Sequence, residues 1–270
     1  MSIEQVEIAE NSTNLRETSW LRWYPVWSRN MRVWRKLIGP ALLGNIGEPL
    51  LYLFALGYGL GGFLGKDIQG LEYVVFLASG LVCSSAMNTA SFEGMYSAYT
   101  RMAVQDTWIG MLTAPLSIRD IIIAEVIWAG TKSAISVTAI VLVASVMGLV
   151  ADTWAILVIP LAVLVGACFG SMALVVTSLA KNYDFFLYYF TLLITPMLLL
   201  SGVFFPIDSM PQMVQAIAMV LPLYHGLGLM RPLMIGQLPV DIVLHLAVLC
   251  GYIAIALPLA IHLISRRLLR

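Results

Sequence analysis

Long apolar runs separated by short polar interruptions fill most of this chain. Each run is long enough to form a helix across a hydrocarbon layer, which takes about 20 apolar residues. The pattern therefore predicts an all-α, polytopic membrane protein with six transmembrane helices. The predicted spans cover residues 38–62, 73–98, 117–149, 154–180, 184–205 and 241–264.

An amphipathic segment precedes the first span. In a helix, its indole rings gather on one face and its cationic groups on the other. This predicts an interfacial connecting helix over residues 20–37, with Pro25 at its true start, anchored in the lipid headgroup layer. The simpler alternative is a basic flank that only orients the first span. The predicted anchors are Trp20, Trp23, Trp27, Trp34, Arg29 and Arg32.

Two further non-spanning segments lie at the N-terminus and before the last span. Residues 1–19 are polar and acidic and lack the order of a secretory signal, so we expect a flexible cytoplasmic N-terminus. Residues 206–239 contain five prolines and are too broken for one span. They predict an outer re-entrant helical hairpin that carries His225 and Arg231. His225 is either a structural hydrogen-bonding residue or a proton relay.

The polar loop between the second and third apolar runs has signals for a helix of its own. Asp106 and Thr107 can cap a short helix over residues 106–114, and Pro115 stops it. Ser117 and Asp120 then form a capping box for the third span. An exposed apolar helix outside the membrane needs a partner, and the hypothesis is a separate ATP-hydrolysing subunit. The predicted coupling residues are Asp106, Thr107, Trp108, Ile109, Met111 and Leu112.

Charged residues within apolar runs are costly in a membrane and need a reason. Four of them flank the polar loop and predict a charge network that braces its ends, against separate snorkelling or lipid pairing: Glu93, Arg101, Glu125 and Lys132. Glu48, followed by Pro49, is either a packing residue beside a kink or part of a transport path. Tyr188 and Tyr189 form an aromatic belt or stack on a sugar-bearing substrate.

Composition supports the membrane class and charge gives an orientation. The 270 residues are 60% hydrophobic and only 11% charged, with a mean hydropathy of +0.89. The net charge of zero indicates no nucleic-acid partner. Most Lys and Arg residues fall on one side of the six-span arrangement, and only Lys66 and Arg231 fall on the other. The positive-inside rule then places both termini in the cytoplasm.

The sequence contains no motif for catalysis or nucleotide binding. The three cysteines, Cys83, Cys168 and Cys250, have no metal-ligand spacing, so we expect no metal site and no cofactor bound by this chain. The chain also shows no repeat of one half in the other and is short for a complete secondary transporter. A transport chain without an energy source predicts a partner that supplies one.

Several long blocks of the sequence resemble a known family. They are NIGEPLLYLFALGYGLG (45–61), FEGMYSAYTRM (92–102), MLTAPLSIRDIIIAEVIWAGTK (111–132), YDFFLYYFTLLITPMLLLSGVFFPI (183–207) and LPLYHGLGLMRPL (221–233). The chain is similar to the membrane subunits of type-2 ABC exporters, and especially to nodulation-type permeases of lipooligosaccharide export. The resemblance implies a transmembrane domain over residues 38–270, a coupling helix in the first cytoplasmic loop and a homodimer in the bacterial inner membrane.

The same resemblance implies two copies of an ATP-binding partner that holds ATP and Mg. This chain would then be a transport subunit and not an enzyme, and its substrate an amphiphilic or lipid-linked glycan. Three alternatives stay open at this point: an exporter of drug-like amphiphiles, an exporter driven by an ion gradient, and a membrane scaffold that transports nothing.

Overall fold

The computed structural model describes residues 21–59 and 70–268, apart from the side chains at 40–43, 45 and 46, and all regular structure there is helical. The all-α class is thus confirmed. Four helical segments are long and apolar enough to cross a membrane, or five if one bent pair counts as a span. They are α5 (Tyr73–Phe92) extended by the π-helical turns η2 (Glu93–Ser97) and η3 (Thr100–Val104), α7 (Ile118–Val146), η4 (Thr153–Leu157) with α8 (Val158–Leu179), and α13 (Ile242–Leu268).

The other predicted spans are shorter or broken. The first is α3 (Ile38–Tyr52) followed by the π-helix η1 (Leu53–Tyr58), and its predicted end lies outside the described residues. The fifth is α9 (Phe185–Tyr189), η5 (Phe190–Ile194) and α10 (Thr195–Leu200), a shorter apolar helix. The total of six spans therefore stays a prediction.

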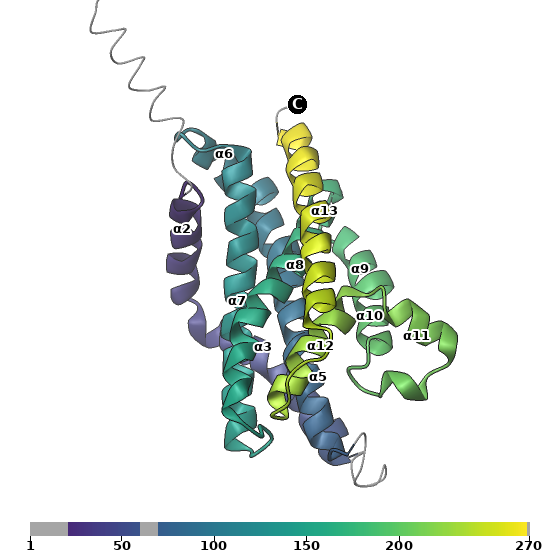
Figure 1. Cartoon of the computed structure of the whole chain (residues 1–270). Helices are drawn as coiled ribbons and strands as arrows, with labels where there is room; N and C mark the ends of the chain where they lie inside the picture. Colours follow the sequence, from purple (N-terminus) through teal and green to yellow (C-terminus); the bar gives the residue numbers. More distant parts are fainter. Residues whose placement is uncertain (1–20, 60–69, 269–270) are drawn as a thin grey trace, which may run out of the picture.

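The proline-rich segment before α13 folds into short helices. After a turn of 3-10 helix, η6 (Ile207–Ser209), α11 (Gln212–Ala218) and α12 (Pro222–Met234) meet at an angle of 86°, which suits a broken span or a re-entrant loop. Pro222 stands in the first turn of α12, where a missing N–H costs no hydrogen bond. Figure 1 shows α11 standing away from the bundle while α12 lies among the long helices. The re-entrant arrangement itself stays a prediction.

The helix α2 (Tyr24–Arg35) differs from the predicted interfacial helix in what its tryptophans face. Figure 1 shows it running alongside α7. Trp27 Nε1 donates a hydrogen bond to Thr131 Oγ1 at 3.1 Å, and the Trp34 ring packs edge-on against Trp128 with 6.3 Å between ring centroids. Both indoles therefore contact protein instead of anchoring the helix in lipid. Trp20 and residues 1–19 lie outside the described residues, and Trp23 is partly buried against the core.

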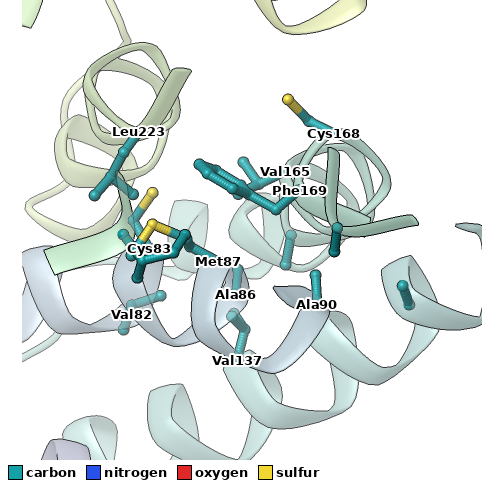
Figure 2. Packing of buried hydrophobic residues seen from close by; sticks show 14 of the residues in the cluster. Val82, Cys83, Ala86, Met87, Ala90, Val137, Val165, Cys168, Phe169 and Leu223 are labelled. Carbon is teal, nitrogen blue, oxygen red and sulfur yellow. The ribbon is translucent and has the colours of Figure 1, made fainter. Parts of the chain in front are cut away.

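Small residues allow α8 to pack closely in the middle of the bundle. A Cβ atom added to Gly166 would lie 2.5 Å from Ser133 Oγ of α7, and one added to Gly94 would lie 2.7 Å from Ala173 Cβ of α8. Close backbone approach of this kind is the usual way in which helices associate where both faces are apolar. Figure 2 shows the resulting core, in which Cys83 and Met87 of α5 lie between Leu223 of α12 and Phe169 of α8.

Candidate functional site

The charge-free stretches of two long helices end at the same level of the bundle. In α5 the 20 residues from Tyr73 to Phe92 contain no charge, and Glu93 follows directly. In α7 no charged residue lies between Lys132 and the end of the helix at Val146. Because about 20 apolar residues cross the hydrocarbon layer, we expect Glu93 and Lys132 to lie at one edge of that layer. Figure 1 shows that α6 (Thr107–Leu112) and the C-terminal end of α13 lie toward this end of the bundle.

The four charged residues predicted to brace the polar loop lie together at this edge. Arg101 Nη2 contacts Glu93 Oε1 at 2.7 Å, and Arg101 also holds Glu125 through Nε at 3.0 Å and through Nη2. Lys132 Nζ contacts Glu93 Oε2 at 2.7 Å. The ion pairs therefore form a chain from Lys132 to Glu93 to Arg101 to Glu125, which we name the buried charge network. Its charges balance, as the low polarity of such a site requires.

The geometry of this network follows from the direction of helical side chains. Arg101 lies in η3 at the end of the α5 segment, and helical side chains lean toward the N-terminus. A long guanidinium side chain can therefore reach back to Glu93 on the same helix and across to Glu125 on α7. The arginine binds Glu125 through two of its nitrogens, which is the strong, orienting form of the arginine–carboxylate contact.

Two tryptophan indoles also donate hydrogen bonds to the carboxylates of Glu93 and Glu125. Trp128 Nε1 donates to Glu93 Oε1 at 2.9 Å, and Trp108 Nε1 donates to Glu125 Oε1 at 3.3 Å. Trp108 belongs to α6 and is 0% exposed. The sequence interpretation that placed Trp108 on an exposed docking face is therefore wrong, because its indole N–H finds a buried carboxylate. Instead, Trp108 ties α6 to the buried charge network.

The remaining residues of α6 divide between an inner and an outer face. Met111 and Leu112 are half-buried against the core, whereas Ile109 is 52% exposed. Thr107 Oγ1 donates only a long 3.4 Å hydrogen bond, to Gln105 Oε1. The outer face of α6 therefore offers Ile109 and Gly110 to a partner.

The boundaries of this loop agree only partly with the expected capping. Ser117 and Asp120 form the predicted capping box at the start of α7, with both reciprocal hydrogen bonds present. Asp106 makes no side-chain cap, because its backbone is left-handed with φ of 49°. A residue other than glycine rarely adopts this left-handed conformation. Asp106 adopts it in the tight turn that leads into α6, where the surrounding structure holds the backbone in place.

Sequence reasoning missed Asn30 of α2 and gave its neighbour Arg29 a different role, and both residues reach this region. Asn30 is only 3% exposed, and its side-chain oxygen accepts a hydrogen bond from Arg29 Nη1 at 3.1 Å. Partial burial and, to a smaller degree, the nearby charge of Arg101 lower the pKa of Arg29, while Glu125 acts in the opposite direction. Arg29 was predicted as a lipid anchor, yet it lies beside the buried charge network. Arg32 is exposed and bonds to the Ser28 carbonyl of its own helix.

The three residues proposed for a transport path have different environments. Glu48 is exposed on α3 and lines a small cavity with Asn88 of α5. Tyr188 is 64% exposed, whereas Tyr189 is 8% exposed and belongs to the core. The structure therefore leaves Glu48 and Tyr188 accessible and removes Tyr189 from any open surface of this chain.

The two residues assigned to the outer cap are both held by hydrogen bonds. His225 Nε2 lies 2.8 Å from the Met219 carbonyl oxygen and must donate to it. Its Nδ1 lies 2.8 Å from His245 Nδ1, so in the neutral pair His225 accepts and His245 donates. Arg231 donates to Ser79 Oγ at 3.0 Å and to the Gly202 oxygen at 2.8 Å, and it lies 3.8 Å from the Phe76 ring centroid. Both residues are built into the fold.

Two features bear on the chemistry of the site and on its family. Among the residues that the structure describes, no group of three His, Cys, Asp or Glu side chains is placed to hold a metal. A family model described as ABC-2 type transporter matches residues 23–235. The chain belongs to the ABC-2 type transporter family.

Curated relatives of this ABC-2 chain agree with the family. Nodulation protein J of Rhizobium leguminosarum bv. viciae is 43% identical over 250 residues, covering 93% of this chain and 96% of that protein. Nodulation protein J of Rhizobium meliloti is 40% identical over 247 residues, covering 92% and 94%. Inner membrane transport permease YadH of Escherichia coli is 24% identical over 240 residues, covering 87% and 91%.

Membership of the ABC-2 family fixes the general role of this chain. It is the membrane subunit, or permease, of an ABC transporter, a non-catalytic and multi-pass component that works with an ATP-binding subunit. The family resemblance read from the sequence is therefore confirmed.

Proposed function

We propose that this chain moves an amphiphilic or lipid-linked glycan, similar to a lipooligosaccharide, out across the bacterial inner membrane. Two copies would form a six-span-per-chain homodimer with both termini in the cytoplasm. Two ATP-binding subunits, which hold ATP and Mg, would dock on α6 of each copy. The observation that carries this proposal is the division of α6 into two faces, with Ile109 exposed and Trp108 buried against Glu125.

This division gives ATP-driven motion a route into the membrane helices. A push on the outer face of α6 moves Trp108, whose N–H is bonded to Glu125 of α7. Arg101 joins Glu125 to Glu93, so that the same displacement reaches the end of α5. A network of buried charges with two discrete arrangements is a physical carrier of coupling between sites.

The cargo proposal rests on relatives and on an exposed aromatic surface. Several relatives at 40% identity or more are named Nodulation protein J. Phe92 stacks on Tyr96, and Tyr96 lies parallel to Tyr183 at 6.1 Å with 9° between the ring planes. Phe92 and Tyr183 remain 46% and 40% exposed. Aromatic faces suit both sugar rings and apolar chains, and a drug-like amphiphile is the alternative cargo.

Docking on α6 is tested by placing a charge on its outer face. Ile109→Asp would force a carboxylate into an apolar contact, which costs on the order of several kcal/mol if the charge stays unpaired. We expect the affinity for the co-expressed ATP-binding subunit to fall at least about tenfold, since each factor of ten needs only about 1.4 kcal/mol. Binding is measured with the purified subunits in lipid nanodiscs.

Met213→Asp is the matched control, because Met213 is 77% exposed on α11 and distant in sequence from α6. This variant should bind the ATP-binding subunit like the unmodified chain. Equal affinities for Ile109→Asp and Met213→Asp would remove α6 as the docking helix. Transport by this chain alone on an ion gradient would overturn the ATP-driven mechanism.

A further inference from the structure

A cavity of about 320 Å³ lies beside the buried charge network, between α2, the π-helical end of α5, and α7. One side is polar and carries three cations and the carboxylate of Glu93, and the other is formed by apolar and aromatic side chains of α2 and α7. The lining includes Arg29, Asn30, Val33, Trp34, Arg101 and Lys132. Its volume is large enough for a group much bigger than one water molecule, whose share of the liquid is about 30 Å³.

Two hydrogen-bond donors in this lining have no acceptor. Asn30 Nδ2 and Trp34 Nε1 are buried and find no partner among the residues that the structure describes. Asn30 is 3% exposed, and its oxygen is already engaged by Arg29, so the amide is oriented with its N–H₂ group unused. Leaving a buried donor unpaired is unfavourable, and such groups almost always have a protein, water or ligand partner.

The cations around the cavity are also incompletely balanced. Arg101 and Lys132 pair with Glu93 and Glu125, but no ion pair of Arg29 occurs within the described part of the chain. Arg29 is close enough to Arg101 for the two like charges to disfavour each other, which contributes to its lowered pKa. A bound anion would remove this repulsion and accept the two free N–H groups at once.

The position of the cavity restricts the kind of anion. Glu93 and Lys132 line it, and we expect these residues to lie at one edge of the hydrocarbon layer, where lipid phosphates lie. Val33 and Leu37 of α2, 47% and 57% exposed, line its apolar side. A phosphate that enters here can therefore keep an attached apolar group in contact with Val33 and Leu37.

We propose that this cavity binds a phosphate group, held by Arg29, the Asn30 amide and the Trp34 indole N–H. An anionic membrane lipid is the source that the apolar side favours, and free phosphate is the other source of the same chemistry. This inference does not depend on the proposed cargo or on docking at α6. It assigns one defined phosphate-binding cavity to Arg29, Asn30 and Trp34, whereas the sequence pattern predicted only a general anchoring of α2 in the headgroup layer.

The test measures binding to the purified full chain in a neutral detergent, without any ATP-binding subunit. Short-chain phosphatidylglycerol, phosphatidylcholine and inorganic phosphate are the three probes, and binding is read from the concentration dependence of the thermal midpoint. We expect phosphatidylglycerol to raise the midpoint with an affinity at least about tenfold higher than phosphatidylcholine, since only the former carries net charge.

Three variants of α2 decide whether the effect belongs to this cavity. Arg29→Gln and Asn30→Leu should each weaken phosphatidylglycerol binding about tenfold or more. Arg32→Gln changes an exposed arginine of the same helix and should keep the affinity within about twofold, because an exposed charge is screened. Trp34→Phe, which keeps one aromatic ring and removes the indole N–H together with the second ring, covers the case in which Asn30→Leu fails to fold.

The possible outcomes distinguish a lipid phosphate from free phosphate as the ligand, and both from the absence of a site. Variant-sensitive binding of phosphatidylglycerol but not of inorganic phosphate supports a lipid site. If phosphatidylglycerol and inorganic phosphate bind with similar affinity and the variants weaken the binding of both, the same site binds a free anion. Equal affinities in the unmodified chain, Arg29→Gln and Trp34→Phe would overturn the proposal. Because no ATP-binding subunit is present, such a failure leaves the proposed transport function untouched.

Discussion

Two half-buried arginines at opposite ends of the α5 segment are held by different kinds of partner. Arg101, near the end of this segment, is held by two carboxylates from α5 and α7. Arg231 of α12 bonds to Ser79, close to the start of α5, and to the Gly202 oxygen, with its guanidinium over Phe76. No carboxylate pairs with Arg231 in the described part of the chain.

The difference indicates different roles for the two ends. Charged partners give large energies that depend steeply on distance, so a chain of ion pairs can switch between arrangements when α6 is moved. Neutral oxygen atoms and an aromatic ring bind a cation less strongly than carboxylates do. They also offer no second charge with which the cation could form another ion pair. The Arg101 end is therefore suited to transmit movement, and the Arg231 end to keep α5 and α12 together.

The largest effect is expected from Arg101→Met. Removing this side chain leaves Glu93 and Glu125 buried with one cation between them, and such losses cost about 3–5 kcal/mol of the free energy of unfolding. Thermal unfolding of the detergent-purified chain measures the loss. Arg119→Met, at an exposed site in the first turn of α7, is the control and should change stability by less than about 0.5 kcal/mol. Equal stability of Arg101→Met and the control would contradict a network that depends on its charges.

Arg231→Met is expected to have an intermediate effect. The substitution leaves the Gly202 oxygen and the Ser79 hydroxyl without their donor, which costs about 1–3 kcal/mol, and Met keeps part of the contact with Phe76. The same unfolding assay applies. A loss as large as that of Arg101→Met would show that the two arginine sites do not differ as their partners suggest.

The smallest of these effects is expected from His245→Phe. This change removes the N–H that His225 Nδ1 accepts, at a cost of about 1 kcal/mol, while the ring keeps its contacts. His262→Phe, at an exposed position of the same helix, provides the comparison. If both variants unfold at the same temperature, the histidine pair contributes nothing to the stability of the fold.

The features that could be predicted from the sequence are those that depend on the order of residues along the chain. Apolar run length gave the helical class and most helix boundaries, and the Ser117–Asp120 spacing gave the capping box. Charges at the ends of apolar runs identified the four residues that the structure brings together, because burial leaves them few other partners. Each of these signals is local or follows from the cost of burying a charge.

Contacts between helices were not accessible in the same way. Helical spacing put Trp27 and Trp34 on one face of α2, and we predicted that this face lies in lipid, whereas Trp27 and Trp34 contact α7. An apolar α6 suggested an exposed Trp108, and only the position of Glu125 explains why its indole turns inward. His245 gave no sequence signal as a partner of His225, since 20 residues and a bend separate them.

We propose that the buried charge network transmits motion from α6 to the membrane helices. The most direct test is the number of substrate molecules moved per ATP hydrolysed, measured in vesicles that contain this chain and its ATP-binding subunit, with a fluorescent acylated oligosaccharide as substrate. Glu125→Gln keeps the size of the side chain and removes the charge that holds Arg101. We expect ATP hydrolysis to be largely retained and transport per ATP to fall at least about tenfold, a loss of about 1.4 kcal/mol of coupling. An unchanged ratio, with transport and hydrolysis falling together or not at all, would contradict it.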